Sequence, residues 1–174
     1  MIENFCGKTV IITGASAGVG AACARAFAAQ NAKLVLVARG RAGLNKIAKE
    51  LREQCEVLTQ VMDVADTEQC LKLLKKAEAK FGQVHVLINN AGMHARGDLE
   101  KIDPADVAAM VDINLRAPMV LSCAAIPFLR KAGSGAIVMI GSLAGRAPLQ
   151  GAVTYSGTKA GLRAFAYGLA DELK

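Results

Sequence analysis

A tyrosine and a lysine, Tyr155 and Lys159, lie four positions apart near the end of the 174-residue sequence, and Ser142 precedes them. Side chains at positions i and i+4 project from the same face of a helix, so the phenol would lie beside an ammonium group. A nearby ammonium favours the phenolate, which suits a tyrosine that donates a proton in one direction of a reaction and accepts it in the other. With the Ser142 hydroxyl as a neutral donor to an oxygen, the three residue types indicate acid–base chemistry at a carbonyl or alcohol. Taken alone, the tyrosine and lysine also fit an ordinary packed helix.

A glycine-rich segment, residues 13–20 (TGASAGVG), follows the first apolar run of the sequence and precedes an alanine-rich helical pattern. In such a turn, backbone amides face a pyrophosphate at the N-terminus of the following helix. Gly14, Gly18 and Gly20 are spaced as G-x-x-x-G-x-G, which by itself also fits a tight turn without a ligand. Its position between a strand and a helix favours a dinucleotide site.

The end of the second apolar run indicates which dinucleotide is bound. NAD-binding units usually have an acidic residue there, which bonds the ribose 2′-hydroxyl. This sequence has Ala38 and Arg39 instead, followed by Arg41, and no acidic residue lies between Asn4 and Lys49. Because a guanidinium group suits a 2′-phosphate, we expect NADP(H) to be preferred over NAD(H). The alternative is that both arginines are only solvated.

Short apolar runs alternate with longer helical patterns along the sequence. The expected strands are Lys8–Thr13, Lys33–Ala38, Glu56–Met62, Val84–Asn89 and Gly135–Gly141. The expected helices are Gly18–Gln30, Arg41–Gln54, Thr67–Phe81, Pro104–Lys131 and Thr154–Leu173, with Thr67 as a cap and Asp103-Pro104 as a helix start. Strands this apolar indicate burial on both faces of a parallel sheet. The alternation predicts an α/β fold, a doubly wound parallel β-sheet of the Rossmann type in three α/β/α layers, with residues 1–174 as one dinucleotide-binding and catalytic domain.

Several short motifs follow one another along the chain: Thr13-Gly14-x-x-x-Gly18-x-Gly20, Asp63-Val64, Asn89-Asn90-Ala91-Gly92, Asn114, Ser142, Tyr155 and Lys159. In this order and spacing, they resemble the short-chain dehydrogenase/reductase family over the whole chain. The resemblance implies that Tyr155 is the catalytic acid/base, assisted by Lys159, Ser142 and Asn114. It also implies a helix irregularity at Asn114, whose side chain could hold a proton-relaying water.

The same resemblance implies the residues that contact the cofactor. Those at the phosphates and 2′-phosphate are Gly14, Ser16, Gly18, Val19, Gly20 and Arg39. Those at the adenine and the nicotinamide ribose are Asp63, Val64, Asn90, Gly92, Tyr155 and Lys159. Adjacency to the motifs places Met93, His94, Arg96, Leu143, Ala144, Leu149 and Gln150 beside the substrate pocket.

The function implied is an NADP(H)-dependent oxidoreductase that transfers a hydride between the nicotinamide and a carbonyl or secondary alcohol. The alternative is a non-catalytic NADP(H)-binding or regulatory protein with the same fold. Family members continue with two more strands and a helical substrate-binding segment, so the chain is expected to be truncated after the fifth strand and the following helix. A homodimer or homotetramer through Pro104–Lys131 and Thr154–Leu173 would also resemble the family.

The composition argues against other classes of protein. A net charge of +6 with scattered basic residues and 4% aromatic residues does not fit nucleic-acid binding. The five cysteines form no C-x-x-C pattern, and His85 and His94 lie away from clustered acids, so we expect no metal site and a reducing compartment. No signal peptide is recognised and no apolar run approaches the ~20 residues of a membrane span. We therefore expect a cytoplasmic protein.

Overall fold

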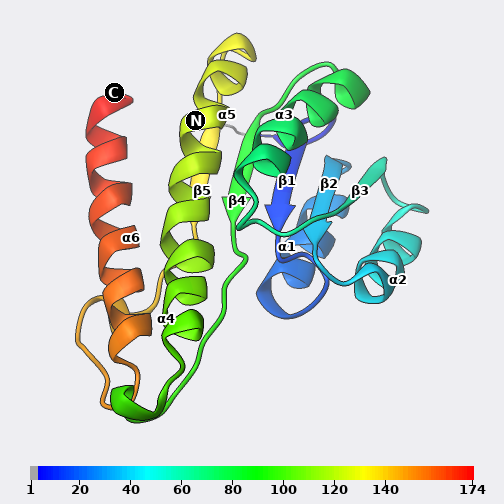
Figure 1. Ribbon diagram of the computed structural model, residues 1–174. Helices are drawn as coiled ribbons and strands as arrows, with labels where there is room; N and C mark the ends of the chain where they lie inside the picture. The colour runs from blue at the N-terminus through cyan, green and yellow to red at the C-terminus, as the bar shows by residue number, and fades with distance from the viewer. Residues whose placement is uncertain (1–3) are drawn as a thin grey trace.

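A parallel sheet of five strands, in the order β3-β2-β1-β4-β5, forms the centre of the protein (Figure 1). The computed structural model describes residues 4–174. The strands are β1 (Thr9–Thr13), β2 (Lys33–Ala38), β3 (Val57–Val61), β4 (Val86–Asn89) and β5 (Ala136–Met139). This order, in which the chain starts in the middle and winds to both sides, confirms the doubly wound α/β fold.

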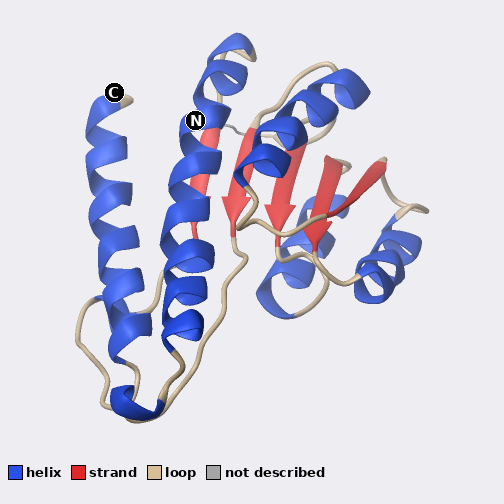
Figure 2. Cartoon of the chain, viewed as in Figure 1, coloured by secondary structure: helices blue, strands red, loops and turns tan. Residues whose placement is uncertain are grey.

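Helices cover both faces of the sheet (Figure 2). On one face lie α1 (Gly18–Ala28) and α2 (Arg41–Leu51), and on the other lie α3 (Thr67–Phe81) and α5 (Ala117–Lys131). The remaining helical elements are η1 (Leu99–Lys101), α4 (Pro104–Val111), the π-helical η2 (Asp112–Arg116), η3 (Leu143–Gly145) and α6 (Val153–Glu172). In Figure 1, α6 runs beside the long helix formed by α4, η2 and α5.

The hydrophobic core has two parts because successive side chains of a strand point to opposite faces. Val10 and Ile12 of β1 pack in the cluster under α1 and α2, whereas Ile11 packs in the cluster under α3 and α5. Burial on both faces, expected for every strand, applies to β1, β2 and β4. It does not apply to the edge strands β3 and β5, where Val138 is 39% exposed.

The helix ends differ in part from the sequence-based expectation. Helix α3 is capped by Asp66, whose carboxylate accepts a 3.0 Å hydrogen bond from the backbone N–H of Gln69. Thr67, expected as the cap, is instead the first helical residue. Asp103 caps α4 as expected, and its carboxylate accepts a hydrogen bond from the N–H of Ala105.

The sequence-based expectation that no apolar stretch has the length of a membrane span is corrected by the continuous helix 104–131. Within residues 4–174, it is the stretch that is long and apolar enough to cross a membrane by length and composition, with a mean hydropathy of 1.4. However, 44% of its most apolar window is buried inside the protein. Because the core helix of a soluble protein passes the same test, this finding is weak evidence for a membrane span.

Candidate active site

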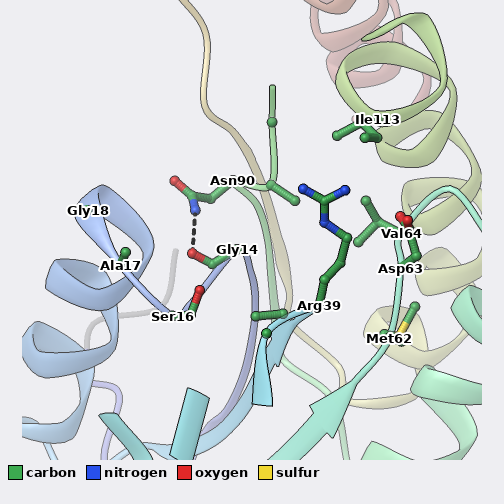
Figure 3. Close-up of a pocket in the computed structure, with 14 residues that line it drawn as sticks. Gly14, Ser16, Ala17, Gly18, Arg39, Met62, Asp63, Val64, Asn90 and Ile113 are labelled. Carbon is green, nitrogen blue, oxygen red and sulfur yellow. Dashed lines mark hydrogen bonds between the residues drawn. The ribbon is translucent and has the colours of Figure 1, made fainter. Parts of the chain in front are cut away.

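A cavity of about 480 Å³ lies at the carboxyl ends of β1, β2, β3 and β4 (Figure 3). Eight residues predicted to contact a cofactor line it: Gly14, Ser16, Gly18, Arg39, Asp63, Val64, Asn90 and Gly92. Met62 and Ile113 also line the cavity, although no sequence motif indicated them. The carboxyl edge of a parallel sheet is the usual ligand site in doubly wound folds, so the structure brings the predicted residues together where a dinucleotide would lie.

The glycines of the turn have different structural roles. Gly14 and Gly18 have positive φ angles of 66° and 55°, a conformation that residues with a side chain rarely adopt. A Cβ atom on Gly20 would lie 2.3 Å from the carbonyl oxygen of Gly14, so this glycine allows α1 to approach β1 closely. Four residues predicted to contact the cofactor are not among those that line the cavity: Val19, Gly20, Tyr155 and Lys159.

Asn90 ties the glycine turn to the end of β4. Its side-chain amide donates to the carbonyl oxygens of Thr13, at 2.9 Å, and Gly14, at 3.2 Å. The Thr13 hydroxyl accepts from the backbone N–H groups of Asn90 and Ala91. Two adjacent strands are thus locked together where each reaches the cavity. The predicted place of Asn90 beside the cofactor is compatible with this role, because the residue also lines the cavity.

Arg39 extends from the end of β2 into the cavity, toward the side formed by Val64 (Figure 3). The ion pairs found within residues 4–174 do not include its guanidinium group. Opposite it, Asp63 accepts a 2.9 Å bond from the N–H of Ala65, and the buried Val64 offers an apolar wall. The arrangement suits a flat aromatic ring beside an anionic group.

Tyr155 and Lys159 lie on one face of α6 as predicted, with the Lys159 Nζ atom 5.8 Å from the centre of the tyrosine ring. Lys159 is only 6% exposed, and its ammonium donates a 2.7 Å hydrogen bond to the carbonyl oxygen of Ile140. Burial lowers the pKa of Lys159 from its ordinary value. The lysine is thus oriented before any ligand binds.

Ser142 lies just beyond β5 and caps the short helix η3, because its hydroxyl oxygen accepts a 3.2 Å bond from the N–H of Ala144. Helix η3 packs directly on α6. A Cβ atom on Gly145 would lie 2.6 Å from the carbonyl oxygen of Lys159. This close approach brings the segment that contains Ser142 against the helix that contains Tyr155.

Asn114 lies within the π-helical η2 and is fully buried. Its side-chain oxygen accepts from the N–H of Met93, and its side-chain nitrogen donates to the carbonyl oxygen of Met93, each at 2.8 Å. The same nitrogen lies 3.3 Å from the Thr158 hydroxyl. The helix irregularity is confirmed. The side chain contacts Met93 and Thr158 in this structure, and the water that it was expected to hold stays a prediction.

His94 is in contact with the tyrosine. The two ring centroids are 4.3 Å apart and the rings are nearly perpendicular, at 75°. His94 follows Gly92, which lines the cavity, and Met93, which Asn114 holds. This chain of contacts places Tyr155 next to the end of the cavity formed by Gly92. Within residues 4–174, no group of three or more histidines, cysteines or acids could hold a metal ion.

Comparison with known proteins gives a consistent result. The family model described as short chain dehydrogenase matches residues 8–174. An uncharacterized oxidoreductase of Staphylococcus saprophyticus is 33% identical, over 95% of this chain and 72% of its own length. Sulfoacetaldehyde reductase 2 of Chromohalobacter salexigens is 36% identical, over 95% of this chain, which spans 66% of that relative.

A solved structure agrees with both sequence comparisons. The crystal structure of a metagenomic short-chain oxidoreductase in complex with NADP superimposes with a TM-score of 0.92. The two chains are 33% identical, and the match covers 97% of this chain and 77% of the other. Fold, motifs and relatives agree: this chain belongs to the short-chain dehydrogenase family of oxidoreductases.

Proposed function

We propose that the chain binds NADP(H) in the cavity and interconverts a carbonyl compound and the corresponding alcohol, with Tyr155 as the acid/base. The observation that carries the proposal is the pair formed by Tyr155 and the buried Lys159, next to a cavity lined by the glycine-rich turn. The bound nicotinamide would supply or accept the hydride. The aldehyde reductase named among the relatives supports a carbonyl substrate.

The residues of the cavity fit the cofactor. A volume of about 480 Å³ lies within the range of small-molecule sites, about 300–1,000 Å³. A Cβ atom on Gly18 would meet no other atom within 4 Å, so the turn leaves open space in front of the N-terminus of α1. That N-terminus favours the pyrophosphate, and Arg39 favours the 2′-phosphate of NADP(H). Val64 and Ile113 would face the adenine.

The catalytic residues have complementary tasks. The hydroxyl group of Tyr155 would donate its proton to the substrate oxygen as that oxygen gains negative charge, and would take the proton back in the reverse reaction. The ammonium of Lys159 would stabilise the phenolate that remains. Because the Ser142 oxygen already accepts from Ala144, its own hydrogen can be donated to the same substrate oxygen. Asn114 would keep the loop after β4 in place.

The experiment is a titration of the protein with NADPH and NADH, followed by an assay of NADPH absorbance with a panel of aldehydes and ketones. We expect NADPH to bind more tightly than NADH and at least one carbonyl compound to be reduced. Equal or tighter NADH binding would overturn the cofactor preference. NADPH binding without turnover of any substrate would favour a regulatory NADP(H)-binding protein instead.

We further propose that residues 1–174 act as one dinucleotide-binding and catalytic domain in the cytoplasm, as a homodimer or homotetramer. The outer surfaces of α4 and α6 support the assembly, since they expose Val111 and Tyr167. Light scattering of the purified protein tests the assembly, and a monomeric mass at micromolar concentration would overturn it.

A further inference from the structure

Arg116, the last residue of η2, connects two segments that are far apart in the sequence. Its Nε donates to the carboxylate of Asp112 at 2.7 Å, within η2 itself. Its Nη1 donates to the Thr67 hydroxyl at 2.9 Å, and its Nη2 donates to the Ala65 carbonyl oxygen at 2.7 Å. The guanidinium group thus holds the loop between β3 and α3 against the π-helix, with a fixed geometry that lysine cannot reproduce.

Both connected segments form the cavity wall. The loop presents Asp63 and Val64, directly before Ala65, and η2 presents Ile113. Under the proposed function, these residues face the adenine end of the cofactor. Any displacement of the loop from η2 would therefore change the width of the adenine pocket.

The π-helix also reaches the catalytic end. Asn114, two residues before Arg116, holds both backbone polar groups of Met93, next to the His94 ring that contacts Tyr155. It also contacts Thr158, the neighbour of Lys159 in α6. Hydrogen bonds therefore connect Ala65 to Arg116, the backbone of η2 connects Arg116 to Asn114, and hydrogen bonds of Asn114 reach the two catalytic segments.

From these contacts we infer that Arg116 is a positioning residue that couples the adenine end of the cavity to the catalytic end. A ligand at the adenine end stabilises the loop, Arg116 passes this constraint to η2, and Asn114 passes it to the catalytic segments. Coupling of this kind requires a physical connection that both sites can influence. The inference rests on the proposed NADP(H) site and adds a role that no sequence motif indicated.

The structure offers a matched control for Arg116. Lys131, at the other end of α5, donates a 2.8 Å bond to Glu78 of α3. It also joins the segment after η2 to α3, but neither residue lines the cavity. Removing this ion pair tests the general effect of loosening α5 from α3.

The test compares wild type with Arg116→Met, Arg116→Lys and Lys131→Met. The probes are NADPH and 2′,5′-ADP, which carries the adenine and the 2′-phosphate without the nicotinamide. We expect Arg116→Met to raise the Kd of both probes about tenfold and to lower kcat, because three hydrogen bonds of a charged group are lost. Arg116→Lys should be intermediate, and Lys131→Met should bind like wild type.

Hydrogen exchange distinguishes coupling from simple destabilisation. In wild type, saturating 2′,5′-ADP should slow amide exchange at Met93, which Asn114 holds and which lies beyond the probe. In Arg116→Met this remote protection should be lost even when the probe is saturating, and in Lys131→Met it should remain. All variants are measured at a temperature where circular dichroism shows them folded.

The outcomes separate this inference from the proposed function. If wild type binds neither NADPH nor 2′,5′-ADP, the proposed function fails, and the inference fails with it. If wild type binds both and Arg116→Met shows the affinities and remote protection of Lys131→Met, only the role of Arg116 is overturned.

Discussion

The phosphate end and the catalytic end of the site differ in what determines their geometry. At the phosphate end, the geometry requires residues without a side chain, because a Cβ atom on Gly20 would lie 2.3 Å from the Gly14 carbonyl oxygen. At the catalytic end, it depends on side chains that are present, Tyr155 and Lys159 on α6 and Ser142 beyond β5. Substitutions at the first end should therefore damage folding and cofactor binding. Removal of the Tyr155 hydroxyl at the second should remove turnover and leave cofactor binding intact.

The largest effect should come from Tyr155→Phe. Loss of the proton donor should lower kcat by roughly 100- to 10,000-fold, while the Kd of NADPH stays as in wild type. The change is measured by NADPH oxidation with a carbonyl substrate and by fluorescence titration. Tyr167→Phe is the control, since this tyrosine lies on the same helix but is 63% exposed. Retained turnover in Tyr155→Phe would contradict the assignment of Tyr155 as the acid/base, and with it the proposed difference between the two ends.

The phosphate end is tested by Gly20→Ala. The added methyl group has no room beside the Gly14 carbonyl oxygen, so we expect a loss of about 1–3 kcal/mol in the free energy of unfolding and weaker NADPH binding. Urea denaturation and titration measure both effects. Gly168→Ala, a helical glycine with nothing within 4 Å of the added atom, should instead stabilise the protein by about 0.5–1 kcal/mol. Similar effects of the two substitutions would contradict the steric argument.

Arg39→Gln examines a position at the phosphate end where the expected contact with the cofactor depends on a charged side chain. Removing the charge should reduce the preference for NADPH over NADH about tenfold, because a charge-assisted contact with the 2′-phosphate is lost. The Kd of NADH should change little. Arg41→Gln is the control, because Arg41 begins α2 and is not among the residues that line the cavity. An equal loss of NADPH preference in both variants would show that only the overall positive charge of this region matters, and not the position of Arg39.

The smallest effect should come from His85, which lies away from both ends. Its Nδ1 accepts a 3.1 Å bond from the N–H of Thr9, and burial, with smaller effects of Lys8 and Lys33, lowers the pKa of His85. As the pH falls, the unfolded chain therefore takes up the proton before the folded protein does. The stability that neutral His85 contributes is complete above about pH 6.5 and is lost as the pH falls through the lowered pKa.

We expect a small loss in the free energy of unfolding between about pH 7 and pH 5, measured by urea denaturation. His85→Asn keeps a hydrogen-bond acceptor without titrating, so its stability should depend less on pH than that of wild type. If His85→Asn kept the wild-type dependence, acid instability would have to come from other groups.

The fold and most of the cavity wall were predictable because they follow from local patterns. Apolar runs of strand length, the glycine turn after β1 and the residues ending β2, β3 and β4 all have fixed positions in a doubly wound sheet. Eight predicted cofactor residues indeed line the cavity. The burial of β3 and β5 was overestimated, because an apolar run does not show that a strand lies at the edge of the sheet.

Contacts between distant segments were not predictable. The bonds of Arg116 to Thr67 and Ala65 span 49 and 51 positions, and no spacing rule connects them. The contact between His94 and Tyr155 depends on the path of a loop, as does the hydrogen bond from the Met93 N–H to the Asn114 side chain. A single sequence contains the residue types for these contacts but not the distances between them.

The π-helical segment Asp112–Arg116 makes the number of residues at this point as important as their identity. Each residue of a regular α-helix turns the chain by about 100°, so deleting one residue here and restoring an α-helix would rotate all of α5 relative to α4. The apolar side of α5 would turn away from the sheet, and Arg116 would turn away from the loop it holds. Attempts to recombine this chain with its relatives should therefore keep their crossover points outside residues 112–116.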